Sequence, residues 1–359
     1  MSGVRTLQII GSKRLGGAEG FFLRLHEALV RADDISSTAI TPRDSELNQG
    51  VVAPFEHASM RSVFDPFSRM ALGRLIRRHQ PDVVQTWMGR ASRLVRLPER
   101  GAPVHVARLG GFYNPARYRH AHALVGNTRG ICDFLVRAGV PASRVSYIGN
   151  FVPQPRPVPA SELQSCRESL GIPADARVIF SLGRLHENKA FDTLLRAFEQ
   201  LRPMPNDCRI HLILAGDGPL AEPLQHQAAQ SPVADRIHWL GWQHDPSPWF
   251  CLADVFVCPS RHEPLGNVLL EAWAHSCPLV TTRTAGALEL VEDEVSGLLC
   301  EIDEPHHMAA QIQALLSAPM SHRLQLAEQG REVLQKNHSE VAVVRAYVNL
   351  YRQLMDGKH

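Results

Sequence analysis

The chain has 359 residues, 44% of them hydrophobic and 21% charged, and its formal net charge is +2. This length favours two domains over one, and the composition is ordinary for a soluble globular protein. No apolar run is long enough to cross a bilayer, and the N-terminal apolar segment is too short for a signal peptide. The seven cysteines are scattered without a CxxC pair, which argues against a disulfide framework or a zinc knuckle and favours buried thiols in a reducing cytosol.

The first half of the chain alternates short apolar runs with amphipathic stretches, which predicts βαβ units around a parallel sheet. The expected strands are 7–10, 82–86, 105–108 and 123–126, and the expected helices are 18–31, 68–79 and 129–138. Residues 1–150 hold 21 Lys and Arg against 11 Asp and Glu, a net +10, whereas residues 151–359 carry −8. A basic first half favours an anionic partner, although a general surplus of arginine would produce the same imbalance.

The expected helix 68–79 reads SRMALGRLIRRH, with apolar residues set among four arginines. A segment of this kind could rest on an anionic membrane surface, or it could be a core helix with a solvated face.

Residues 151–159 read FVPQPRPVP, with four prolines in nine residues. Proline at this density interrupts helices and central strands and predicts a stiff, extended connector. We therefore place one domain at 1–152 and a second at 153–340, and expect the C-terminal segment 341–359, helical over about 341–355, to rejoin the first domain.

The second half repeats the strand–helix alternation. The expected strands are 178–182, 210–215, 237–240, 255–258 and 279–282, and the expected helices are 191–201, 220–230, 268–275 and 304–317. Within it, residues 181–192 read SLGRLHENKAFD, so that Arg184 and Lys189 follow a strand ending at Gly183 and precede a helix. Two cations beside a helix N-terminus, at the carboxyl end of a parallel strand, suit a diphosphate, although the motif alone is equally typical of two solvated basic residues in a loop.

Two further loops carry chemistry. After the strand that ends at Gly241, the loop with Trp242 and Gln243 could hold a flat base, although Trp242 could equally serve packing. Residues 260–276 read SRHEPLGNVLLEAWAHS, in which proline and glycine keep Glu263 in a loop before a helix. Glu271 lies inside an apolar run, where an unpaired charge would be costly. Two carboxylates at one cleft could hold the hydroxyls of two sugars, with Asn267 as the expected helix N-cap.

The spacing Glu263-x7-Glu271, together with GRLHENK, LAGDGPL and GALELVEDEVSGLL, resembles the second domain of retaining glycosyltransferases of family 4. The resemblance covers roughly the whole chain and is strongest over residues 178–299. The opening GSKRLGGAE is similar to that family's glycine-rich loop on the acceptor side, and residues 107–135 are similar to bacterial lipopolysaccharide-type members. The resemblance implies the GT-B fold, an α/β class with two Rossmann-like domains facing across a cleft.

Carried onto this chain, the resemblance implies that Arg184 and Lys189 neutralise the donor's diphosphate. It implies that Glu271 holds the ribose hydroxyls and that Glu263 holds those of the donor sugar. The catalytic set is then Arg184, Lys189 and Glu263. The donor-binding set is Gly16, Gly17, Gly183, Gly241, Trp242, Gln243, Gly266, Asn267, Val268, Leu269 and Glu271, with the backbone N–H groups of 266–269 facing the sugar or phosphate.

The sequence departs from the family pattern at two places. Ala190 stands where many relatives have glycine, and the strand HVARLGG has Arg108 or Gly110 near a position that is often histidine. The catalytic contact from the first domain is therefore unassigned, with His105, His120 and His122 as candidates.

The implied function is transfer of a sugar from a nucleotide diphosphate sugar, UDP-sugars being favoured, to a hydroxyl of a glycan or glycolipid such as a lipopolysaccharide precursor. No DxD pair follows a strand, so we expect no metal and no cofactor. The alternatives are a GT-B-fold epimerase or hydrolase and a non-catalytic nucleotide-sugar binding module. An NAD-dependent dehydrogenase is excluded because the first loop lacks GxGxxG. We also reject a glycosidase in which Glu263 and Glu271 are the catalytic carboxylates, because the phosphate-type loop with Arg184 and Lys189 would then have no function.

The expected location is cytoplasmic, with peripheral contact at the inner face of the cytoplasmic membrane through the basic first domain. No nucleic acid is expected as a partner.

Overall fold

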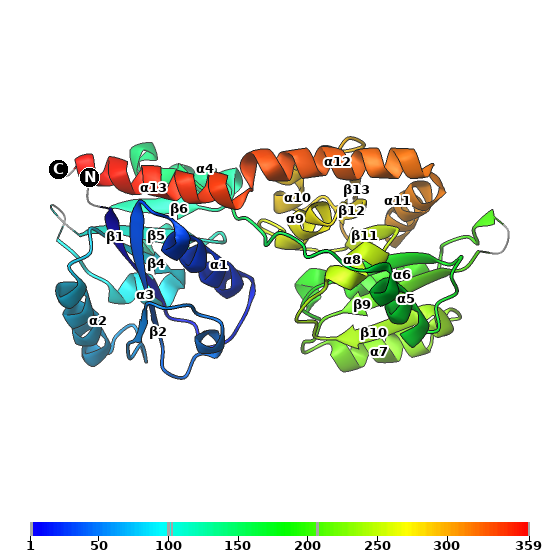
Figure 1. The fold of residues 1–359 in the computed structure, drawn as a ribbon, viewed down its shortest axis with the longest axis horizontal. Helices are drawn as coiled ribbons and strands as arrows, with labels where there is room; N and C mark the ends of the chain where they lie inside the picture. Colours follow the sequence, from blue (N-terminus) through cyan, green and yellow to red (C-terminus); the bar gives the residue numbers. More distant parts are fainter. Residues whose placement is uncertain (1–2, 99–100, 102, 206–207, 358–359) are drawn as a thin grey trace. The chain divides into compact units, whose positions relative to one another are not determined.

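A computed structural model describes residues 3–98, 101, 103–205 and 208–357. The chain forms two compact units, which we call unit 1 (Met1–Val152 with Asn337–His359) and unit 2 (Pro153–Lys336). The chain passes from unit 1 to unit 2 where the proline-rich stretch begins, and both ends of the chain lie in unit 1 (Figure 1).

Unit 1 is built on a seven-stranded parallel sheet in the order β3-β2-β1-β4-β5-β6-β7. Its strands are β1 (Val4–Ile10), β2 (Ile35–Thr41), β3 (Phe55–His57), β4 (Val83–Trp87), β5 (Val104–Leu109), β6 (Ala123–Gly126) and β7 (Val145–Tyr147). Its α-helices are α1 (Gly17–Arg31), α2 (Pro66–His79), α3 (Met88–Leu94), α4 (Arg129–Arg137) and α13 (Glu340–Asp356). The direction of strand addition reverses between β1 and β4, and parallel α/β sheets bind ligands beyond the carboxyl ends of strands at such a point.

The helix α13 completes the core of unit 1, although it is the last element of the chain. Together with α1 it packs on one face of the sheet, while α2 and α3 pack on the other. Tyr347 and Tyr351 of α13 are fully buried. The Tyr351 hydroxyl donates to Gln85 Oε1 at 2.8 Å and accepts from Gln8 Nε2 at 3.2 Å, so α13 is bonded to two central strands.

Unit 2 holds a six-stranded parallel sheet in the order β10-β9-β8-β11-β12-β13. Its strands are β8 (Arg177–Leu182), β9 (Ile210–Ala215), β10 (Ile237–Gly241), β11 (Val255–Cys258), β12 (Leu279–Thr282) and β13 (Leu298–Cys300). Its α-helices are α5 (Ala160–Ser169), α6 (Phe191–Phe198), α7 (Ala221–Ala229), α8 (Ser247–Leu252), α9 (Asn267–Ala274), α10 (Ala285–Leu290), α11 (Pro305–Ser317) and α12 (Met320–Asn337). The strand order reverses between β8 and β11, which places a second candidate crevice at their carboxyl ends.

The nine predicted strands are all present, and the sequence analysis missed β2, β3, β7 and β13. The prediction of buried thiols is confirmed for Cys258, Cys277 and Cys300. It is wrong for the other four cysteines, of which Cys132, Cys166 and Cys208 are half-buried and Cys251 is exposed. Across the described part of the chain, no helix has both the length and the apolar character needed to span a membrane.

Candidate active site

Three of the predicted glycines lie in or beside the loops at the carboxyl edge of the unit 2 sheet. Gly183, after β8, donates its N–H to Ala215 O at 3.0 Å, and Gly216, after β9, donates to Gly241 O at 2.8 Å. A Cβ atom on Gly216 would lie 1.8 Å from Gly183 O, so only glycine lets the two loops approach this closely. At the N-terminus of α9, the third predicted position, Gly266, has a φ of 87°.

Lys189 is positioned by a tight turn between β8 and α6. After β8 the chain makes a single 3-10 turn, Glu187–Lys189, and Ala190 then adopts a left-handed conformation (φ 50°) before α6 begins. Ala190 is fully buried. A non-glycine residue is uncommon in this conformation.

Lys189 forms an ion pair with Glu263, and both side chains are largely shielded, with 25% and 14% of their surfaces exposed. Burial opposes the charge on Lys189, but the carboxylates of Glu263 and Glu271 outweigh it, so the pKa of Lys189 is raised. The amine therefore stays protonated at neutral pH. The structure thus gathers three predicted site residues into one charge cluster, which we call the Lys189 cluster: Lys189, Glu263 and Glu271.

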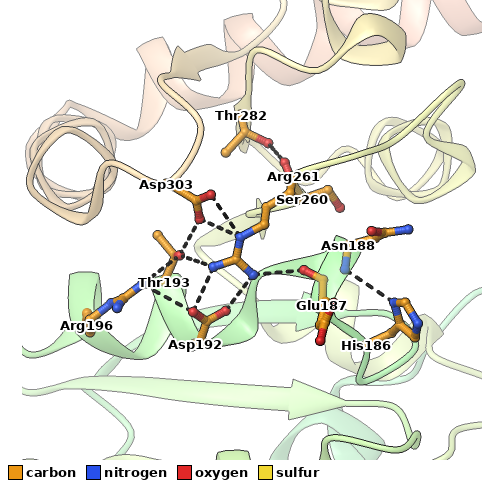
Figure 2. A network of polar contacts seen from close by, with 10 residues as sticks. All are labelled: His186, Glu187, Asn188, Asp192, Thr193, Arg196, Ser260, Arg261, Thr282 and Asp303. Atoms are coloured by element: carbon orange, nitrogen blue, oxygen red, sulfur yellow. Dashed lines mark hydrogen bonds and ion pairs between the residues drawn. The ribbon is translucent and has the colours of Figure 1, made fainter.

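Arg261, which the sequence analysis did not single out, holds the Glu263 loop against the Lys189 turn (Figure 2). Its guanidinium forms a two-pronged contact with Asp192 at 2.9 and 2.8 Å and a further bond to Asp303 Oδ2 at 2.9 Å. Its backbone N–H donates to Asn188 O at 2.8 Å. The bonds to Asp192 are the main cause of a raised pKa for Arg261, which therefore remains a fixed cationic clamp.

The N-terminus of α9 differs from the prediction in two details. Asn267 is the first helical residue and Gly266 is the N-cap, without a side-chain capping bond, so the prediction of Asn267 as the cap is wrong. The reason is that Gly266 takes the left-handed conformation that ends the loop. Leu269 already donates its N–H to Gly266 O at 3.0 Å, so this amide is not available to a ligand.

The loop after β10 exposes a flat ring. Trp242 is 64% exposed. Gln243 bonds instead within its own turn: its Nε2 donates to Leu240 O at 2.9 Å, and its Oε1 accepts from Trp249 Nε1 at 3.2 Å. Gln243 therefore shapes the loop, while Trp242 offers a surface for stacking.

The remaining predicted residues lie in the loop after β8 and in unit 1. Arg184 is exposed, and within the described residues its side chain has neither a hydrogen bond nor an ion pair. Gly16 and Gly17 belong to unit 1, where Gly16 is the N-cap of α1.

The three candidate histidines of unit 1, His105, His120 and His122, have structural partners. His105 Nε2 lies 2.9 Å from Thr86 Oγ1, and His105 N donates to His122 Nδ1 at 2.7 Å. His120 Nε2 lies 2.6 Å from Ser92 O. Burial is the main cause that lowers the pKa of His105 to about 3, so this ring is neutral and part of the core. None of the three is placed as a free acid or base.

Arg108 is likewise enclosed in unit 1. Its guanidinium lies 4.7 Å from the ring centre of Phe21 and 4.6 Å from that of Trp87, and it donates to Asn150 Oδ1. Such cation–π contacts stabilise a buried cation without a carboxylate. Among the residues that the structure describes, no three His, Cys, Asp or Glu side chains are grouped so that they could hold a metal ion.

Comparison with known proteins identifies the chain's family. Residues 176–318 match the family model described as glycosyl transferases group 1. The chain is 34% identical over 342 residues, 93% of its length and 95% of the relative's, to the lipopolysaccharide core biosynthesis glycosyltransferase LpsE of Rhizobium meliloti (strain 1021).

Two solved structures show the same fold. Anabaena Alr3699/HepE, in complex with UDP and glucose, superposes with a TM-score of 0.81 at 20% identity, over 98% of this chain and 100% of that one. A glycosyltransferase from Rickettsia africae ESF-5 superposes with a TM-score of 0.84 at 16% identity, over 99% and 100% of the two chains. The chain therefore belongs to the group 1 glycosyltransferases and is a glycosyltransferase with two Rossmann-like domains of the GT-B class.

Proposed function

We propose that this glycosyltransferase moves a sugar from a nucleotide diphosphate sugar to a hydroxyl of a glycan or glycolipid, with the anomeric configuration kept. The observation that carries the proposal is the Lys189 cluster, a largely shielded cation beside two carboxylates at the carboxyl edge of the unit 2 sheet. A donor of this class has the matching chemistry, since its diphosphate lies between two rings that carry hydroxyls.

In the proposed complex, Lys189 and Arg184 bind the diphosphate, Glu271 accepts hydrogen bonds from the ribose, and Glu263 accepts them from the donor sugar. The base lies at Gly241–Gln243, where the exposed ring of Trp242 allows stacking. Without a ligand, Glu263 neutralises Lys189. A diphosphate would take over that cation and release Glu263 for the sugar hydroxyls. Gly16 and Gly17, in the glycine-rich loop of unit 1, belong to the proposed donor-binding residues.

The chemical difficulty of this reaction is the leaving group. As the glycosidic bond breaks, negative charge grows on the diphosphate while the sugar becomes positively charged. Cations that are already in place, in a site that excludes water, stabilise this charge without reorganisation during the reaction. Lys189 suits this role because its turn is fixed by the left-handed Ala190 and its loop partner is clamped by Arg261.

Two relatives support the choice of substrates. The fold is shared with a protein solved with UDP and glucose, which favours a UDP-sugar as donor. The sequence is similar over nearly its whole length to a lipopolysaccharide core biosynthesis glycosyltransferase, which favours an acceptor from that class of glycolipid.

A thermal-shift panel of UDP-, GDP- and ADP-sugars tests the donor, because a ligand at 100 times its Kd adds about 2.7 kcal/mol of stability. Nucleotide release is then measured with and without a core-truncated lipopolysaccharide, and the anomeric configuration of the product is read by NMR. Acceptor-dependent release with retention supports the proposal. Release that does not need the acceptor indicates a hydrolase, and binding without release indicates a binding module.

We also propose peripheral contact of unit 1 with an anionic membrane. The apolar face of α2 does not serve this purpose, because Leu72 and Ile76 are buried in the core. The exposed apolar residues are instead Phe64, Phe67 and Met70, and the Arg93 guanidinium lies 5.5 Å from the Phe64 ring centre. Aromatic side chains beside arginines suit a lipid interface. Replacing Phe64 and Phe67 by serine should abolish low-salt sedimentation with anionic vesicles, and unchanged sedimentation would count against this contact.

A further inference from the structure

A hollow in unit 1, distinct from the Lys189 cluster, is lined by cations. Two contiguous pockets of about 380 and 420 Å³ share Arg43, Ala58 and Ser59 in their walls. Both volumes fall within the range usual for small-ligand sites, about 300–1,000 Å³. We call the two pockets together the basic hollow, because five of the lining residues are cationic: Lys13, Arg43, Arg61, Arg74 and Arg78.

The basic hollow lies at the edge of the sheet where ligands bind in this class of fold. Lys13 follows β1, Arg43 follows β2 and Arg61 follows β3, so all three come after the carboxyl ends of neighbouring parallel strands. Arg74 and Arg78 come from α2, which packs on the same sheet. Open parallel sheets place their binding residues in the loops at this edge.

The loops that form the walls are fixed to one another. Ser45 Oγ donates to Ser12 O at 2.9 Å, and Glu46 N donates to Lys13 O at 2.9 Å, which joins the loops after β1 and β2. Arg90 donates to Gly11 O at 3.1 Å and to Met60 O at 3.4 Å, which joins the loops after β1 and β3. A hollow with bonded walls is preorganised, and preorganisation reduces the entropy lost on binding.

The cations of the basic hollow exceed the acids that could neutralise them. Asp44 pairs with Lys13, and Glu56 pairs with Arg78. Over the ranges that the structure describes, the guanidinium groups of Arg43, Arg61 and Arg74 make no ion pair and no hydrogen bond, and all three residues are exposed. Asp65 attracts Arg61 from farther away, but its carboxylate already accepts bonds from Ser68 and from a backbone N–H.

We infer that the basic hollow binds the anionic substituents, phosphate or carboxylate, of the acceptor glycan. Guanidinium groups bind both anions through paired hydrogen bonds, and three of them are free to do so here. The inference rests on the proposed function only in naming the acceptor, because the donor diphosphate is assigned to unit 2. The net charge of +10 over residues 1–150 draws such a ligand towards this unit.

The first test is calorimetric binding of three soluble probes to the full chain: inositol hexakisphosphate, an oligogalacturonate and neutral maltohexaose. The unmodified chain should bind at least one anionic probe and not the neutral one, and the preferred probe separates phosphate from carboxylate. Arg43→Ala/Arg61→Ala should weaken this binding at least tenfold. The charge-matched control, Arg117→Ala/Arg137→Ala, removes two exposed arginines of unit 1 outside the hollow and should leave it unchanged.

Three results would overturn the inference. Equal weakening by the control would show a general effect of net charge. If UDP displaces the inositol hexakisphosphate whose binding depends on Arg43 and Arg61, the hollow is a nucleotide site. If Arg43→Ala/Arg61→Ala loses binding to anionic vesicles but still binds the soluble anions, these arginines bind lipid headgroups instead.

The second test separates this inference from the proposed function. With a core-truncated lipopolysaccharide as acceptor, Arg43→Ala/Arg61→Ala should raise the acceptor KM at least tenfold while kcat and the thermal shift by the nucleotide sugar stay unchanged. An unchanged KM would refute the role of the hollow even if transfer occurs. If no sugar is transferred by either chain but the soluble anions still bind at the hollow, the proposed function fails and the anion site remains.

Discussion

Lys189 is the side chain on which the proposed chemistry depends most. It is nearly enclosed, it stays charged because Glu263 and Glu271 raise its pKa, and its turn is held by the buried Ala190. Lys189→Ala should lower kcat about 10²–10³-fold, the usual loss when one donor that stabilises a developing charge is removed.

The control for Lys189→Ala is Lys336→Ala, which removes an exposed lysine at the end of unit 2. Single-turnover rates with a nucleotide sugar provide the measurement, and the melting temperature shows whether each variant is folded. A folded Lys189→Ala enzyme with nearly normal turnover would refute the assigned role.

His105 predicts a pH dependence of stability. Its pKa is about 3 in the folded chain, mainly because of burial, against about 6.5 when unfolded. Below pH 6.5 the unfolded chain binds a proton that the folded chain does not, so stability falls as the pH falls. The loss from this one ring should reach about 2 kcal/mol at pH 5 and continue towards pH 3.

Denaturation at pH 7, 6 and 5 measures this effect. His105→Gln should show a slope of stability against pH that is shallower by about 1.4 kcal/mol per pH unit below 6.5, whatever its stability at pH 7. Identical slopes in the two chains would mean that His105 is not the group responsible.

The sequence could predict Lys189, Glu263 and Glu271, because each lies in a short motif in which residues close in sequence show whether it is in a loop or at the start of a helix. It could not predict Arg261. The partners of Arg261 are Asp192 and Asp303, 69 and 42 residues away, and only the folded sheet brings them together. For the same reason, the basic hollow was visible only as a surplus of charge in the first half of the chain.

At the scale of elements, the turn after β9 makes a second close backbone approach to the loop after β8. A Cβ atom on Gly218 would lie 2.4 Å from Leu185 O, and Leu185 N already donates to Asp217 O at 3.0 Å. Gly218→Ala must therefore push two loops apart, which should destabilise unit 2 by about 1–3 kcal/mol.

A matched control for this substitution is Gly73→Ala in α2, where the nearest atom to a new Cβ is the flexible end of Arg77 at 3.6 Å. That change should be neutral or stabilise the helix by up to about 1 kcal/mol. Chemical denaturation of both variants provides the comparison, and an equal effect of the two would argue against crowding at Gly218.

The strands that the sequence analysis missed share a cause. β2 reads ISSTAIT, and two of its buried positions are the polar residues Ser37 and Thr41, so no apolar alternation marks it. Ser37 Oγ lies 3.0 Å from His26 Nδ1, and Thr41 Oγ1 donates to Asn48 Oδ1 at 2.7 Å. These partners come from α1 and from the loop after β2. β3, β7 and β13 are three residues each, too short for a period to be seen. The longer, apolar central strands were predictable to within a few residues.

At the scale of the whole molecule, unit 1 depends on a helix encoded at the far end of the chain. α13 places Tyr347 and Tyr351 in the core of unit 1 and bonds to β1 and β4. A chain ending at Lys336 should therefore lose the cooperative unfolding transition of unit 1 and keep that of unit 2, as measured by calorimetry and limited proteolysis.

Tyr351→Phe is a milder test of the same packing than the truncation. It keeps the ring and removes the hydroxyl that bonds to Gln8 and Gln85. The expected loss is about 1–3 kcal/mol, because Gln85 Oε1 loses its donor and Gln8 Nε2 keeps only a long bond of 3.5 Å to Thr6 Oγ1. If the truncated chain keeps both transitions, the packing of α13 is not required for unit 1 to fold.

The insertion of unit 2 between two parts of unit 1 has a consequence during protein synthesis. The ribosome makes every strand of the second sheet before it makes the helix that carries Tyr347 and Tyr351. Until α13 has been synthesised, the nascent first sheet exposes to solvent the apolar surface that this helix covers in the folded unit. Chaperones that bind such surfaces should therefore engage this chain late, after unit 2 has already folded.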